Sequence, residues 1–313
     1  MRLQNRWRIA KRRLDATGET HGNNDPWTVD MIIKRILTAV LPATVRNKVD
    51  LAREEKGLRA SPSARCNTEN LRKASTLTVP EIFESPIIES KWNESRAKLD
   101  ALCIPDGTGG VNPGDRRAVN YLVSALKPLS VLEIGTHIGA STVNIASALM
   151  TNQTSNRRNA TLTTVDISDV NSTTTKPWLK YGAKHSPSEM INSLGLQSMV
   201  EFVTEKSLEY ASRCKRKFDF IFLDGNHEAK TVYSEVPVAL KLLKPNGVIL
   251  LHDYYPDLKP LWSNGSVVPG PFLATHRFRA EGANISVLPL GALPWPTKLQ
   301  SNFTSLALLL KGE

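Results

Sequence analysis

The sequence has no apolar run long enough to cross a bilayer, and its basic start is not followed by the apolar core of a signal peptide. We therefore expect a soluble protein. Cysteine is scarce: Cys66, Cys103 and Cys214 are the three present, without a C-x-x-C spacing or a paired histidine spacing. This argues against a structural zinc site and favours a reducing compartment, so a cytoplasmic location is expected.

Two common phosphate-binding patterns are also missing. The sequence contains no G-x-x-x-x-G-K-[ST] segment, which excludes a phosphate cradle of that type. It also lacks the three-glycine G-x-G-x-x-G spacing that holds a dinucleotide pyrophosphate. An NAD-binding oxidoreductase is therefore disfavoured.

The net charge of +10 is concentrated at the start of the chain. Residues 1–75 carry sixteen Lys and Arg against eight Asp and Glu, whereas residues 76–313 carry twenty-four against twenty-two. An enzyme that acts on nucleic acid should carry its basic surface around the active site, so no nucleic-acid partner is expected. A nucleic-acid-binding or RNA-modifying protein that uses a basic arm of residues 1–24 stays open as an alternative.

Residues 1–80 read as a helical extension in front of a main domain of residues 81–313. After the basic arm, Asp25 and Pro26 begin an amphipathic helix that runs to Pro42. A second helix is expected from Thr44 to Leu58, followed by a linker to Pro80. The amphipathic helix could dock on the main domain, form a homo-oligomer, or place residues 1–48 at an anionic membrane surface.

The central motif of the chain is the segment from Val131 to Thr142. Its apolar start predicts a buried strand, its glycines a turn, and the following apolar spacing a helix. Glycine permits a positive φ and lets a ligand approach the backbone closely. The amide groups at the start of the helix would then face that ligand.

Three further predicted strands end in an acidic residue. Asp166 ends a strand that begins at Leu162, Asp224 follows the strand from Phe218 to Leu223, and Asp253 follows the strand from Val248 to Leu251. In a parallel sheet these ends lie at the ligand-binding edge. Asp166 is at the place where such folds bind ribose hydroxyls, and His227 follows Asp224 by three residues.

These segments resemble class I S-adenosylmethionine-dependent methyltransferases, and specifically the small-molecule O-methyltransferase branch that includes sugar and catechol O-methyltransferases. The resemblance covers residues 105–310. It implies an α/β, Rossmann-like, seven-stranded and mostly parallel sheet with helices on both faces. Residues Asn284 to Leu288 and Ser305 to Leu310 would form its C-terminal antiparallel hairpin.

The resemblance also implies the roles of individual residues. His227 would be the general base, since histidine suits proton abstraction near neutral pH. Asp224 and Asp253 would be catalytic as ligands of a divalent ion such as Mg²⁺. Because Tyr254 stands where catechol-type relatives have Asn, metal dependence stays open. The expected S-adenosylmethionine-binding residues are Glu133, Gly135, Thr136, Gly139, Ser141, Thr142, Asp166 and Ser207.

The leading hypothesis is therefore an O-methyltransferase that modifies a hydroxyl group of a sugar or glycosylated metabolite. A catechol or phenolic O-methyltransferase is the alternative within the same family. A small-molecule or glycan acceptor is the expected partner in the first case, and an aromatic acceptor in the second.

Overall fold

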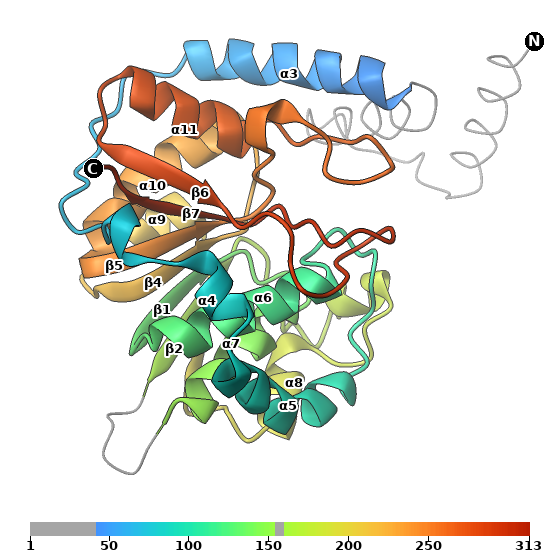
Figure 1. Ribbon diagram of the computed structural model, residues 1–313. Coiled ribbons are helices and arrows are strands. Elements are labelled where there is room, and N and C mark those ends of the chain that lie inside the picture. The colour runs from blue at the N-terminus through green and yellow to red at the C-terminus, as the bar shows by residue number, and fades with distance from the viewer. Residues whose placement is uncertain (1–41, 154–159) are drawn as a thin grey trace, which may run out of the picture.

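The computed structural model describes residues 42–153 and 160–313 (Figure 1). The basic arm and the amphipathic helix predicted before Pro42 lie outside these ranges. Within these ranges, no helix combines the length and the apolar character needed to cross a membrane.

A seven-stranded sheet forms the centre of the molecule, with strand order β3-β2-β1-β4-β5-β7-β6. Strands β1 to β5 are parallel to one another, whereas β7 is antiparallel to both β5 and β6. The predicted Rossmann-like fold and its antiparallel C-terminal strands are thus confirmed. The strands are β1 (Ser130–Ile134), β2 (Thr161–Asp166), β3 (Val200–Thr204), β4 (Phe218–Leu223), β5 (Leu243–Leu251), β6 (Ile285–Pro289) and β7 (Ala307–Lys311).

Helices cover both faces of the sheet, as Figure 1 shows. The α-helices are α3 (Ala43–Arg59), α4 (Val79–Phe83), α5 (Pro86–Asp100), α6 (Pro113–Leu126), α7 (Ala140–Thr151), α8 (Pro187–Ser193), α9 (Ser207–Arg213), α10 (Ala229–Leu242) and α11 (Gly270–Ala280). Short 3₁₀ helices occur at Ala74–Thr76, Pro177–Tyr181 and Pro256–Leu258.

Alternating side chains of the central strands divide the core into two parts. Phe220 and Phe222 of β4 pack with α5, α6 and α7, whereas Ile221 and Leu223 pack with α10 and α11. Successive residues of a strand point to opposite faces, so strands that are apolar throughout fit a sheet covered on both sides. Because β1, β2, β4 and β5 are parallel, their carboxyl ends lie at one edge of this covered sheet.

Strand β5 begins earlier than the sequence predicts. The segment from Lys244 to Gly247 reads as a turn, yet β5 already starts at Leu243, which pairs with Phe218. The register then shifts, and Val248 pairs with Phe220. The intervening residues bulge out of an otherwise continuous strand, which explains why turn-forming residues occur inside it.

The described part of the N-terminal extension packs on the main domain. Helix α3 lies beside α10 and α11 (Figure 1). The buried Glu54 of α3 accepts a hydrogen bond of 2.7 Å from the backbone N–H of Ala229. The segment expected to be a linker forms β-bridges from Leu71 to Gly247 and from Lys73 to Lys311. The division of the chain at residue 80 stays a prediction.

Candidate active site

The glycine turn after β1 packs closely against the end of β4. Gly135 has a φ of 96°, and a Cβ atom on it would lie 2.1 Å from the carbonyl oxygen of Asp224. Gly139, with a φ of 78°, precedes α7, and a Cβ atom there would lie 2.8 Å from Cβ of Pro187. Both positions therefore require glycine for backbone conformation and for space.

Asp166 holds the same turn from the end of β2. Its Oδ2 atom accepts hydrogen bonds from the backbone N–H groups of Thr136 at 3.1 Å and His137 at 2.9 Å. Its Oδ1 atom accepts one from the N–H of Ser168 at 2.9 Å. The Asp166 carboxylate thus fixes the turn, and it also lines a cavity at this edge of the sheet.

A cavity of about 730 Å³ opens at the carboxyl edge of the sheet. This volume is in the range of cofactor sites. Of the predicted cofactor-binding residues, Gly135, Asp166 and Ser207 line it. The lining residues are Gly109, Gly110, Ile134, Gly135, His137, Val165, Asp166, Ile167, Glu205, Lys206, Ser207, Leu208, Glu209, Asp224, Gly225, Asn226, His227, Thr231 and Glu235.

The other predicted cofactor-binding residues do not line the cavity. Glu133 is fully buried beneath the turn, where its Oε2 atom accepts hydrogen bonds from the hydroxyls of Thr142 at 2.6 Å and Thr164 at 2.7 Å. The Thr136 hydroxyl lies 2.6 Å from that of Thr164. Gly139 and Ser141 also lie outside the cavity lining. The side-chain hydrogen bonds of Glu133, Thr136 and Thr142 therefore stabilise the turn from its buried side.

Burial raises the pKa of Glu133 to about 7, although the hydroxyls of Ser141, Thr142 and Thr164 oppose the shift. A raised folded-state pKa contributes stability below the unfolded pKa and loses it as pH rises toward 7. We expect the free energy of unfolding to fall by about 3 kcal/mol from this group between pH 4 and pH 8. Glu133→Gln should flatten that slope in urea titrations.

The exposed Glu84→Gln serves as the matched control for the buried Glu133. It should leave the pH dependence of stability unchanged. A Glu133→Gln protein with the wild-type slope would show that Glu133 ionises freely in the folded state.

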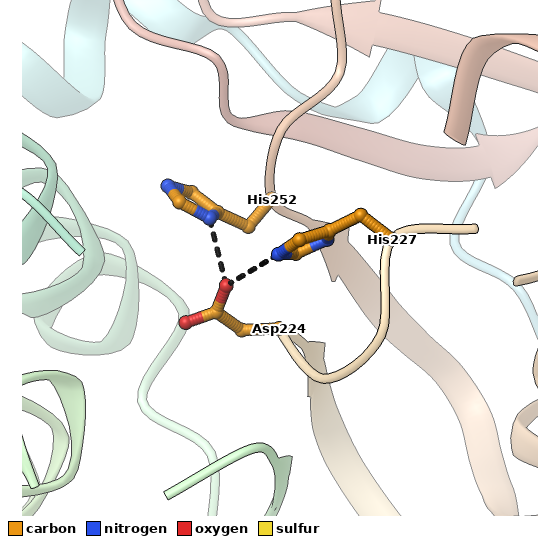
Figure 2. A group of neighbouring side chains, drawn as sticks. All are labelled: Asp224, His227 and His252. Atoms are coloured by element: carbon orange, nitrogen blue, oxygen red, sulfur yellow. Dashed lines mark ion pairs between the residues drawn. The ribbon is translucent and has the colours of Figure 1, made fainter. Parts of the chain in front are cut away.

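A cluster of acids and histidines lies beside the cavity, at the ends of β4 and β5 (Figure 2). Nδ1 of His252 lies 2.7 Å from Oδ1 of Asp224, and Nε2 of His227 lies 3.5 Å from the same oxygen. Nε2 of His227 is also 3.6 Å from Oδ2 of Asp253. The predicted catalytic residues His227, Asp224 and Asp253 are thus brought together.

The two histidines differ in their exposure to solvent. His227 keeps 24% of its side chain exposed, whereas His252 keeps 8%. Burial lowers the pKa of His252, but the carboxylates of Asp224, Asp253 and Asp115 outweigh it and raise that pKa well above its usual value. Burial alone would raise the pKa of Asp253. The positive charges of His252, His227 and Lys298 outweigh burial and lower that pKa. A molecule in the cavity can therefore reach His227 more readily than His252.

Sequence reasoning missed three residues of the site. Asp115 in the first turn of α6 is fully buried, with Oδ2 3.5 Å from Nε2 of His252. It reads as a capping residue, and no signal links it to the sheet edge. His252 reads as a structural histidine. Its position directly before Asp253, at the end of a predicted strand, could have indicated that it belongs to the site. Glu235 is a buried acid among the apolar positions Val232 and Val236, an unusual pattern that could have marked it.

The cluster has a donor set that fits a divalent ion. Asp224, His227 and His252 each offer one ligand atom, and these atoms lie within 4.8 Å of one another. The buried Oδ1 of Asp115 has no hydrogen-bond partner in the described part of the chain. Carboxylate oxygens suit Mg²⁺ or Mn²⁺, whereas imidazoles favour transition metals. Asp253 is not part of this group, so a hard ion held by Asp224 and Asp253 stays a prediction.

One known family model matches part of the chain. Residues 132–254 match the family described as a methyltransferase domain, and that range contains the glycine turn, Asp166 and the acidic ends of β4 and β5. No curated protein matches the sequence.

Several solved structures are similar to this chain. The O-methyltransferase TomG from Streptomyces achromogenes, in complex with SAM, is 17% identical; the match covers 73% of this chain and 91% of that one, with a TM-score of 0.47. An O-methyltransferase from Bacillus cereus in complex with SAH is 20% identical over 71% and 90% of the two chains, with a TM-score of 0.46.

The family match falls on the residues from which the sequence predicts the cofactor turn and the acidic strand ends, and the sheet is the seven-stranded, mostly parallel one that was expected. Residues 132–254 of the chain therefore resemble a methyltransferase domain.

Proposed function

We propose that the chain is an S-adenosylmethionine-dependent O-methyltransferase that modifies a hydroxyl group of a sugar or glycosylated metabolite, with His227 as the general base. The observation that carries the proposal is the position of His227 at the wall of the cavity, between the carboxylates of Asp224 and Asp253.

Methyl transfer to oxygen is an in-line displacement, so the hydroxyl must be aligned with the sulfonium and must lose its proton. Alignment supplies roughly 7 to 11 kcal/mol in well-oriented reactions. His227 would take the proton, and the two carboxylates near its Nε2 atom would stabilise the resulting imidazolium. The hydroxyl oxygen forms the new bond to the methyl carbon, and the bond from that carbon to sulfur breaks.

Asp224 and Asp253 are proposed to hold a divalent ion such as Mg²⁺. When bound, such an ion would lower the pKa of an acceptor hydroxyl that contacts it. His252, which lies close to both Asp224 and Asp115, would orient the Asp224 carboxylate.

Transfer of an isotope-labelled methyl group to a panel of glycosides and catechols tests the acceptor class. We expect labelled methyl ethers of glycosides, with turnover that falls after chelation and returns with Mg²⁺. Turnover of catechols alone would favour the phenolic alternative. Full turnover after chelation would remove the metal from the proposal. Salt-sensitive RNA binding that needs residues 1–24 would favour the nucleic-acid alternative.

Asp166 is proposed to bind the ribose hydroxyls of the cofactor, because its carboxylate borders the cavity and anchors the turn. We expect Asp166→Ala to weaken S-adenosylhomocysteine binding by roughly 10- to 100-fold in calorimetric titrations, since charged hydrogen bonds are lost. The exposed Asp169→Ala is the matched control. Unchanged affinity in Asp166→Ala would show that the ribose lies elsewhere.

A further inference from the structure

The order of chemical groups along the cofactor fixes which end of the cavity faces each group. In the proposed function, the sulfonium lies near His227 and the ribose near Asp166. The adenine base is attached to the side of the ribose opposite the sulfonium, so adenine must point to the end of the cavity that lies beyond Asp166. Residues 205–209 follow β3, which lies beyond β2 in the sheet, and Glu235 is hydrogen-bonded to Ser207, so these residues line that end of the cavity.

Glu235 is an unusual residue to find at this end. It is a carboxylic acid on α10 with 6% of its surface exposed. The hydroxyl of Ser207, at the start of α9, donates a hydrogen bond of 2.5 Å to its Oε1 atom. Among the described residues, no basic side chain forms an ion pair with it. A buried acid without a cationic partner is costly, so its presence in a cavity wall points to a ligand.

We propose that Glu235, oriented by Ser207, recognises the adenine base of S-adenosylmethionine by accepting a hydrogen bond from its 6-amino group. This inference rests on the proposed placement of the cofactor. It assigns the recognition of adenine to a residue of α10. The other cavity acids at this end are Glu205, which pairs with Arg213, and the exposed Glu209. Neither offers a buried acceptor free of a basic partner.

Burial raises the pKa of Glu235 to about 7, with the Ser207 hydroxyl acting in the opposite direction. Both protonation states keep an oxygen that can accept from the amino group. A matching amide would therefore keep the contact, whereas a methyl group would not.

The test is calorimetric titration with S-adenosylhomocysteine and with its analogue in which hydrogen replaces the 6-amino group. We expect the wild-type protein to prefer S-adenosylhomocysteine by roughly 10-fold or more, since a buried acceptor is left unpaired by the analogue. Glu235→Ala should reduce this preference to about twofold or less, and Glu235→Gln should retain it.

The exposed Glu84→Ala, at a position outside the cavity lining, is the matched control and should keep the wild-type preference. Equal affinity of the wild-type protein for the two ligands would overturn the proposal without any variant. So would a Glu235→Ala protein that loses thermal stability but keeps the preference. Failure of the wild-type protein to bind S-adenosylhomocysteine at all would instead reject the cofactor site itself, and this inference with it.

Discussion

His227→Ala is expected to lower kcat by roughly 10²- to 10⁴-fold, because the acceptor hydroxyl would lose its general base. S-adenosylhomocysteine should still bind with an affinity near that of the wild-type protein, since the proposed cofactor contacts are the glycine turn and Asp166, which His227→Ala leaves unchanged. Single-turnover methyl transfer separates the chemical step from binding, and calorimetry measures the affinity.

The exposed His276→Ala on α11 is the control for loss of an imidazole, and it should keep full activity. Titration of the divalent ion into His227→Ala shows whether that variant has also lost metal affinity. A His227→Ala enzyme with near-wild-type kcat would remove His227 from the role of base.

Gly135→Ala is expected to destabilise the protein by about 2 to 5 kcal/mol and to abolish binding of S-adenosylhomocysteine. The added Cβ atom would lie 2.1 Å from the carbonyl oxygen of Asp224, at a φ of 96° that strains any residue except glycine. Relief of this overlap must push the turn away from β4. The shift would displace both the cavity wall and the carboxylate that follows β4.

Gly182→Ala is the matched control because Gly182 also has a positive φ, 77°, but a Cβ atom there would meet nothing within 4 Å. It should cost about 1 to 2 kcal/mol and leave cofactor binding intact. Urea unfolding and calorimetry of the two variants separate backbone strain from steric overlap. Equal effects of the two substitutions would show that the turn does not need close packing on β4.

The sheet could be predicted from the sequence because its strands are short apolar runs separated by glycine or acidic turns. The acids at the ends of β2, β4 and β5 could be placed at one edge because parallel strands share the direction of their carboxyl ends. The site residues that lie on helices could not be placed in this way. Asp115 and Glu235 reach the site through the rotation and position of α6 and α10, which packing decides.

Glu133 shows a second limit of sequence reasoning. Its position next to the glycine turn suggests direct contact with the cofactor, but the alternation of β1 directs its side chain beneath the turn, toward Thr142 and Thr164. The direct contact stays a prediction, while the observed hydrogen bonds support a role in holding the turn.

The most direct test of the account is calorimetric titration of the full chain with S-adenosylhomocysteine, with and without Mg²⁺, and with NAD as the control ligand. We expect one equivalent of S-adenosylhomocysteine bound with micromolar affinity, no binding of NAD, and loss of S-adenosylhomocysteine binding in Gly135→Ala. Absence of S-adenosylhomocysteine binding under both conditions, or tight binding of NAD, would contradict it.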